Sequence, residues 1–199
     1  MKVKIACFSL LLTLGLHSVG SAHPHVFIDC DLVFVFDSEG LAGIIQRWVF
    51  DEMFSTMILA HFDQDKDAAL DPDEVNGIRK GAFANLQDYN YFTHIQIGGN
   101  KYVVEKVTDF YATVQDNRLI YTFFVPCRVS AARSLKKIQV AIYDDTYYTD
   151  VKLGIDTPSF DGGDELYSVD YGIDKSPDLS YYGGQIVPEA ITVRFRHRK

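Results

Sequence analysis

The residues of this chain best suited to chemistry are the acids of one short segment, residues 63–74. The segment reads Asp-Gln-Asp-Lys-Asp-Ala-Ala-Leu-Asp-Pro-Asp-Glu, with an acid at every second position in its first half. Calcium takes about six to eight oxygen ligands, and an EF-hand loop supplies them from its positions 1, 3, 5, 7, 9 and 12. The spacing therefore predicts an EF-hand-like calcium site. Its ligands would be Asp63, Asp65, Asp67, the carbonyl of Ala69, Asp71 and Glu74.

One position of this loop departs from the EF-hand pattern. Position 6 normally holds glycine, because the backbone turns there with a positive φ, and this chain has Ala68 instead. A Cβ in that conformation costs about 1 kcal/mol, which is small beside the attraction of several carboxylates for a divalent cation. We therefore expect weakened rather than abolished binding. A solvated acidic turn is the alternative.

The flanking sequences favour a helix on each side of the acidic loop. Apolar residues recur at helical spacing from Phe50 to Phe62 and again from Val75 to Leu86. Asp71 and Pro72 suit the N-cap and first position of the second helix. A helix–loop–helix insertion at about residues 51–88 is predicted, and its calcium affinity should lie near the ~10⁻⁴–10⁻³ M of extracellular modules.

The first 22 residues are typical of a signal peptide. Lys2 and Lys4 precede an apolar run over residues 5–16, which is too short to span a membrane, and small residues follow up to Ala22. Cleavage before His23 is expected, with a cut after Gly20 as the alternative. The product, residues 23–199, would be a single periplasmic or secreted domain. Loss of the two lysines would change its formal charge from −8 to −10.

Cleavage before His23 would leave His-Pro-His at the new N-terminus. His23 would offer an α-amine and an imidazole, and His25, on the same side of a strand, a second imidazole. Such nitrogen ligands suit Ni²⁺, Co²⁺, Zn²⁺ or copper rather than calcium. Binding through deprotonated amides is excluded, because Pro24 has no N–H. His94 and Asp144 are further candidate ligands, and the alternative is a solvated N-terminus with two incidental histidines.

The rest of the chain is dominated by strand patterns. Residues 26–36 alternate apolar and polar and are followed by a turn and a returning strand at 43–49. We predict a mainly β, α+β fold, an antiparallel β-sandwich-like domain interrupted by the helix–loop–helix. Its other elements are expected as hairpins at 91–97/102–107, 110–114/119–125 and 138–143/147–153, surface loops over 156–188, and a last strand at 191–195.

Composition excludes several kinds of function. The formal charge of −8 opposes binding to nucleic acid, and no nucleophile elbow, phosphate loop, CxxC or HExxH motif is present. Cys30 and Cys127 are the cysteines left after export. A disulfide between them and two separate buried thiols remain equal alternatives.

Four strings of the sequence resemble a family of exported bacterial proteins of unknown function, DUF1007. They are Ala-His-Pro-His-Val-Phe-Ile-Asp (22–29), Trp-Val-Phe-Asp-Glu-Met-Phe-Ser (48–55), Tyr-Asn-Tyr-Phe-Thr-His (89–94) and Val-Ala-Ile-Tyr-Asp-Asp-Thr-Tyr-Tyr (140–148). The resemblance implies a periplasmic component of an uncharacterised transport system, acting beside a metal permease or ABC transporter in the inner membrane. It carries over no catalytic residue.

The expected function is therefore that of a non-enzymatic periplasmic metal-binding protein. It would capture a transition metal through His23 and His25, pass it to the permease, and carry one calcium site in its acidic loop. Two alternatives stand beside this expectation. One is a copper redox protein that uses the two histidines as a histidine brace, and the other is a calcium-stabilised adaptor without catalysis.

Overall fold

The computed structural model describes residues 24–198, and the predicted signal peptide and His23 lie outside them. The chain is mainly β, as predicted, and its helical segment lies between the second and third strands. The first half of the order is β1 (Val26–Asp37), β2 (Gly40–Phe50), α2 (Glu52–Phe62), α3 (Pro72–Gly81), the 3₁₀ segment η1 (Phe83–Phe92), β3 (Thr93–Ile97), β4 (Asn100–Tyr102) and β5 (Thr108–Gln115). The second half is β6 (Arg118–Ser130), β7 (Lys136–Ile142), β8 (Thr149–Leu153), β9 (Ser159–Asp161), β10 (Tyr167–Lys175), η2 (Pro177–Leu179) and β11 (Glu189–His197).

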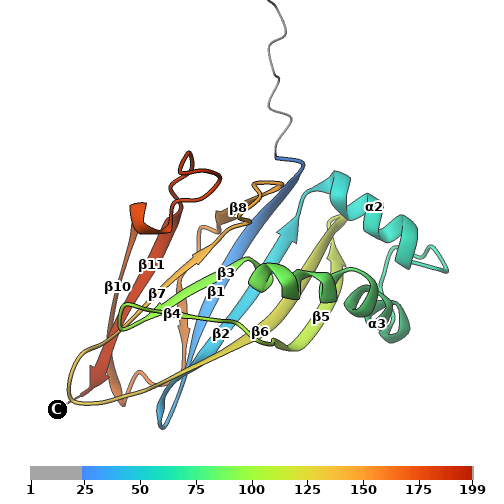
Figure 1. Cartoon of the computed structure of the whole chain (residues 1–199). Helices are drawn as coiled ribbons and strands as arrows, with labels where there is room; N and C mark the ends of the chain where they lie inside the picture. The colour runs from blue at the N-terminus through green and yellow to red at the C-terminus, as the bar shows by residue number, and fades with distance from the viewer. Residues whose placement is uncertain (1–23, 199) are drawn as a thin grey trace, which may run out of the picture.

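The strands form two sheets (Figure 1). The first has the order β5-β6-β2-β1-β8, with β9 also paired to β1, and the second has the order β10-β11-β7-β3-β4. Buried side chains of both sheets belong to one apolar core, in which Phe34, Trp48 and Phe123 of the first sheet are fully buried. Ile95 and Phe195 are their counterparts in the second sheet. β1 contributes to this core because its apolar residues alternate with polar ones, so that every second side chain points inward.

Three expectations about the strands were wrong. Residues 138–143 and 147–153 do not form a hairpin, because β7 lies between β3 and β11 in one sheet while β8 joins β1 in the other. The first sheet is mixed rather than antiparallel, since β8 and β9 both run parallel to β1. The region 156–188 is not all loop, because β10 pairs with β11 along its whole length.

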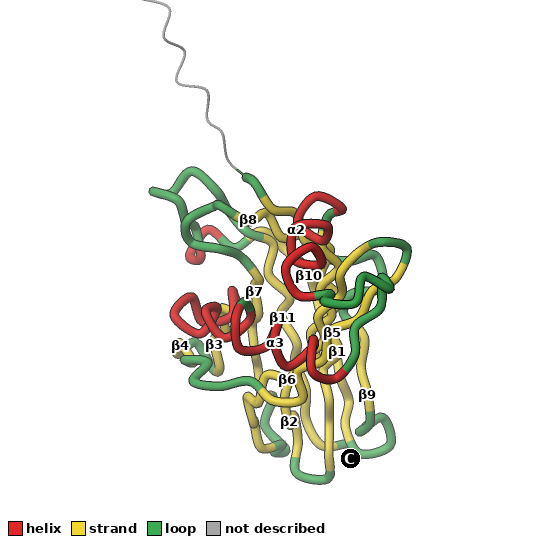
Figure 2. Tube along the Cα trace, turned by 90° about the vertical axis from the view of Figure 1, so that its right-hand side faces the viewer, coloured by secondary structure: helices red, strands yellow, loops and turns green. Residues whose placement is uncertain are grey.

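In the helical segment, α2 contacts β6 and lies near the end where β1 begins, whereas α3 contacts β5 further along the sheet (Figures 1 and 2). Asp51 ties the two together, because one of its oxygens accepts from the backbone N–H of Phe54 at the start of α2 and the other accepts from that of Phe27. Ser55 anchors α2 to β6, where its hydroxyl accepts from the N–H of Leu119. Among the described residues, no helix is long and apolar enough to cross a membrane.

The two cysteines of the described chain are free, so the disulfide alternative was wrong. Cys30 lies on β1 opposite Trp48, whereas Cys127 follows Pro126, which lies opposite Gly43 on the far side of β2. The two residues are thus separated by a strand and by several residues along it, beyond the reach of a disulfide. Burial raises the pKa of Cys30, and it raises that of Cys127 to about 12. Both side chains are small apolar parts of the core.

Candidate functional site

The acidic loop connects α2 to α3 and is held in shape by its own carboxylates. The oxygens of Asp63 accept from the N–H groups of Lys66 and Ala68, at 2.7 and 3.1 Å. Asp65 and Asp67 each accept from the N–H two residues further on. Lys66 and Ala68 have positive φ values of 61° and 63°. Ala68 therefore has the left-handed conformation that its loop position requires, at the steric cost of its Cβ.

These turns bring three carboxylates together. Oxygen atoms of Asp63, Asp65 and Asp67 all lie within 4.8 Å of one another, and no other group of three or more potential ligands converges in this way in residues 24–198. The N–H of Asp67 lowers the pKa of the Asp65 carboxyl, but partial desolvation and repulsion by Asp67, Glu74 and Asp63 outweigh it, so the pKa is raised. A cation at this point would relieve that repulsion.

Asp71 and Glu74 stand at the start of α3, outside this group of three. Asp71 is the N-cap and accepts from the N–H of Glu74, and Glu74 returns the bond by accepting from the N–H of Asp71 at 3.0 Å. The other oxygen of Glu74 accepts from the N–H of Gln64 at 2.7 Å, and the side chain is buried. Glu74 thereby ties the end of the loop to its beginning. Ala69 is exposed, and its N–H donates to the Asp67 carboxylate.

The predicted nitrogen ligands are not assembled in the described chain. His25 is exposed just before β1, where its N–H donates to the carbonyl of Tyr148 and its ring packs 4.9 Å from that of Tyr148. His94 is buried on β3, stacked on the ring of Tyr143 with Nε2 3.1 Å from the carbonyl oxygen of the same residue. Burial lowers the pKa of His94. His23 lies outside the described residues, so the amine–imidazole site stays a prediction.

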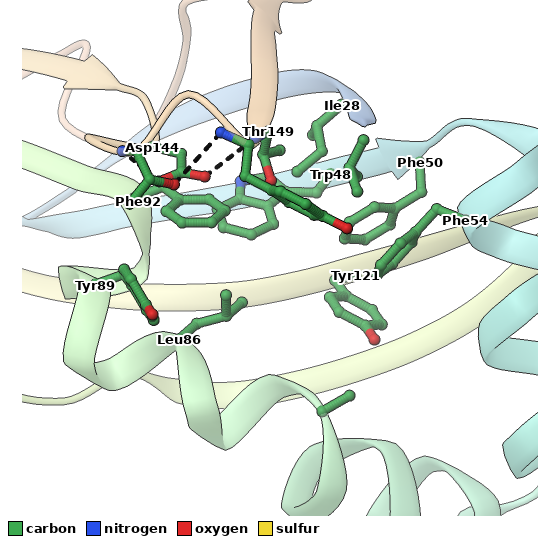
Figure 3. A pocket seen from close by; sticks show the side chains of 14 residues that line it. Ile28, Trp48, Phe50, Phe54, Leu86, Tyr89, Phe92, Tyr121, Asp144 and Thr149 are labelled. Carbon is green, nitrogen blue, oxygen red and sulfur yellow. Dashed lines mark hydrogen bonds between the residues drawn. The ribbon is translucent and has the colours of Figure 1, made fainter. Parts of the chain in front are cut away.

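The sequence did not predict an apolar cavity of about 290 Å³ between the helical segment and the first sheet (Figure 3). Trp48 and Phe50 of β2 form its floor with Tyr121 of β6, and Phe54 of α2 closes one side. Leu86 and the half-exposed Tyr89 line the opposite side, from the segment after α3. The walls are thus mainly aromatic, and they come from five separate parts of the chain.

One end of the cavity is polar. Asp144, which follows β7, is only 3 % exposed and lies among the lining residues with Thr146 and Thr149. One of its oxygens accepts from the N–H and hydroxyl of Thr146 at 2.9 and 2.7 Å, and the other accepts from the N–H of Thr149 at 3.0 Å. This candidate metal ligand therefore organises the turn between β7 and β8 (Figure 3).

All four strings that carry the family resemblance meet at this cavity. Each of them supplies at least two lining residues, although they are spread over more than half of the chain. These four strings were therefore the sequence signal that pointed to the residues of the cavity. The lining residues that these strings supply are Val26 and Ile28; Trp48, Phe50 and Phe54; Tyr89 and Phe92; and Asp144, Thr146 and Tyr148.

Comparison with known proteins agrees with that resemblance. The model of the family described as "Protein of unknown function (DUF1007)" matches residues 8–168. A protein of Spirochaeta aurantia described as "Uncharacterized 15.5 kDa protein in trpE 3'region" is 38 % identical over 138 residues, which cover 66 % of this chain and 93 % of that protein. The family match spans β1 to the start of β10 and includes both the acidic loop and the cavity. The chain therefore belongs to the DUF1007 family.

Proposed function

We propose that this chain is a non-enzymatic metal-binding protein whose acidic loop is an EF-hand-like calcium site inserted into a sandwich-like β scaffold. The observation that carries the proposal is the convergence of Asp63, Asp65 and Asp67 between two helices. The positive φ of Lys66 and Ala68 supports it, since these turns aim successive carboxylates at one point. Half-buried Leu70, packed on the core, supports it as the apolar anchor of the loop.

The chemistry of the loop favours calcium over magnesium. All of its candidate ligands are oxygens, from carboxylates and one backbone carbonyl. Calcium accepts a flexible arrangement of about six to eight oxygens, whereas magnesium demands a near-ideal octahedron and gives up its water reluctantly. Full coordination would add Glu74 to the three clustered aspartates. Its oxygens each keep a lone pair beside the N–H bonds they accept from Gln64 and Asp71.

Calorimetric titration of Ca²⁺ and Mg²⁺ into the full chain, with two matched variants, tests the proposal. We expect one Ca²⁺ per chain and weaker Mg²⁺ binding. Asp65→Asn should lower calcium affinity at least about tenfold, or 1.4 kcal/mol, because a ligand charge is lost. Asp73→Asn removes the same charge from an exposed, non-ligand position of the loop and should change affinity no more than about threefold. Equal losses in the two variants would reveal diffuse attraction and contradict a built site.

Capture of a transition metal by the N-terminus, for delivery to an inner-membrane permease, is the second function we propose. The exposure of His25 just before β1 favours it, because the imidazole stands on the solvent side of the first strand. Chains beginning at His23 and chains extended by one residue should differ in affinity for Ni²⁺, Cu²⁺, Zn²⁺ or Co²⁺, since the extension displaces the α-amine. Equal affinities would exclude the amine as a ligand.

A further inference from the structure

The cavity holds a buried carboxylate, Asp144, that has no cationic partner among residues 24–198. In the described part of the chain, no Lys, Arg or His nitrogen forms an ion pair with Asp144. Its three hydrogen-bond donors are neutral groups of the β7–β8 turn. Burial lowers the pKa of nearby His94, which disfavours a positive charge on that imidazole. A buried charge without a partner is costly, and a bound cation would remove that cost. Two oxygens offer about four acceptor positions, so one remains for a new donor.

The walls around Asp144 suit an organic rather than a hydrated inorganic cation. Trp48 and Phe92 are stacked with centroids 5.7 Å apart, and Phe50 and Phe54 with centroids 4.6 Å apart. Aromatic faces attract cations that lie within about 6 Å of a ring centroid, and Trp is the strongest of them. Apolar walls also favour a ligand with a hydrocarbon surface to bury, and a small metal ion has none. The net charge of −8 draws cations towards the molecule.

A buried polar group without a hydrogen-bond partner in the described chain lines the same cavity. The hydroxyl of Tyr121 is buried and has no hydrogen-bond partner among the described residues. Buried hydroxyls without a partner are rare in folded proteins and call for an explanation such as a bound molecule or water. The volume of about 290 Å³ lies at the lower end of the range for small-molecule sites, so the occupant must be compact.

From these observations we infer that the cavity is a binding site for a compact organic ammonium ion with an apolar or aromatic body. The ammonium group donates to Asp144 at the polar end, and the body lies between Trp48 and the helical side of the cavity. Half-exposed Tyr89 and Tyr148 stand where the ligand enters, at 51 % and 50 % exposure. This site goes beyond the proposed metal sites, and it lies apart from the acidic loop.

Titration with three phenyl compounds of similar shape tests the inference, using the full chain without added metal. The probes are phenethylammonium, the neutral 2-phenylethanol and the anionic 3-phenylpropionate. The chain has one tryptophan, and it lines the cavity, so its fluorescence reports occupancy directly. We expect saturable binding of phenethylammonium, at least about tenfold weaker binding of the alcohol, and none of the acid, because Asp144 selects for positive charge.

Matched variants locate the binding. Asp144→Asn should weaken phenethylammonium about tenfold or more while leaving the alcohol unchanged. Asp145→Asn removes the same charge from the exposed neighbouring position, outside the cavity, and should leave both affinities unchanged. Asp144 also holds the β7–β8 turn in place, so its substitution could disturb the fold. A second variant leaves that turn intact: Ala82→Leu fills the cavity from the helical side and should abolish binding of both compounds.

Two results would overturn the inference. One is an alcohol that binds as tightly as the ammonium ion, because the carboxylate would then select nothing. The other is loss of ammonium binding in Asp145→Asn equal to that in Asp144→Asn, which would place the cation on the acidic surface. Neither comparison depends on the Ala82→Leu variant. The comparison of the alcohol with the ammonium ion needs only the unaltered chain.

Discussion

We expect Glu74→Gln to reduce calcium affinity about a hundred-fold, or about 2.8 kcal/mol, because the substitution removes the carboxylate that would complete the proposed EF-hand-like site. The calcium-dependent rise of the melting temperature should vanish with it. Glu74 also accepts from two backbone N–H groups, and an amide has one oxygen instead of two. A decrease of about 1 kcal/mol in unfolding free energy without calcium should accompany the lost affinity.

Calorimetry and calcium-dependent thermal unfolding measure the two effects separately. Glu52→Gln is the matched control, since Glu52 is an exposed acid in the first turn of α2, outside the loop. It should leave calcium affinity unchanged. Calcium affinity that survives Glu74→Gln would mean that the three aspartates bind alone, without the exiting helix.

The second large effect concerns stability. We expect Gln46→Leu to lower the free energy of unfolding by about 2–3 kcal/mol, because it leaves buried polar groups without partners. Gln46 is fully buried on β2, accepts from the indole N–H of Trp48 at 2.9 Å, and donates to the hydroxyl of Thr93 at 2.8 Å. Thr93 lies on β3, so this amide is a polar link between the two sheets.

Urea denaturation of a double-mutant cycle measures that link. Gln46→Leu and Thr93→Val should be coupled by about 1 kcal/mol, since either change alone breaks the same bond. Gln115→Leu makes the same replacement at the exposed end of β5 and should cost less than about 0.5 kcal/mol. Additive losses from Gln46→Leu and Thr93→Val would show that the bond between the sheets contributes nothing.

Local signals in the sequence predicted the parts of the fold that depend on local interactions. The alternation of residues 26–36 predicted β1, and the pair Asp71-Pro72 placed the start of α3 correctly, because an N-cap acts within its own turn. The predicted start near residue 51 is close to the first residue of α2, Glu52, whereas α3 ends at Gly81 and the 3₁₀ segment η1 continues the helical region to Phe92.

The partners of strands were beyond the reach of local signals. Nothing between residues 143 and 148 reveals that the chain passes from one sheet to the other. β7 pairs with β11 on one edge and with β3 on the other, so neither edge is left for β8. For β10, the alternation of Tyr167, Val169, Tyr171 and Ile173 was present, but intervening Asp and Gly residues suggested loop, and pairing with β11 outweighed their low strand propensity.

The cavity could not be predicted from any one segment, because its walls are brought together only by the tertiary fold. Trp48 and Tyr121 are apolar strand residues like many others until β6 lies beside β2. Asp144 read as a candidate metal ligand, whereas its geometry is that of a turn-forming carboxylate at the end of an aromatic cavity. The carboxylate type of Asp144 made it a candidate for binding a cation, and its aromatic surroundings favour an organic cation over a metal ion.

The helical side of the cavity has a consequence for the two proposed ligands taken together. Phe54 on α2 and Ala82 and Leu86 beyond α3 touch the cavity, and the acidic loop joins these two pieces of wall. A cation that fixes the angle between α2 and α3 also fixes the width of the cavity. For the two proposed sites, thermodynamic linkage would make the effect mutual: the factor by which calcium changes the affinity for the ammonium ion would equal the factor by which that ion changes the affinity for calcium.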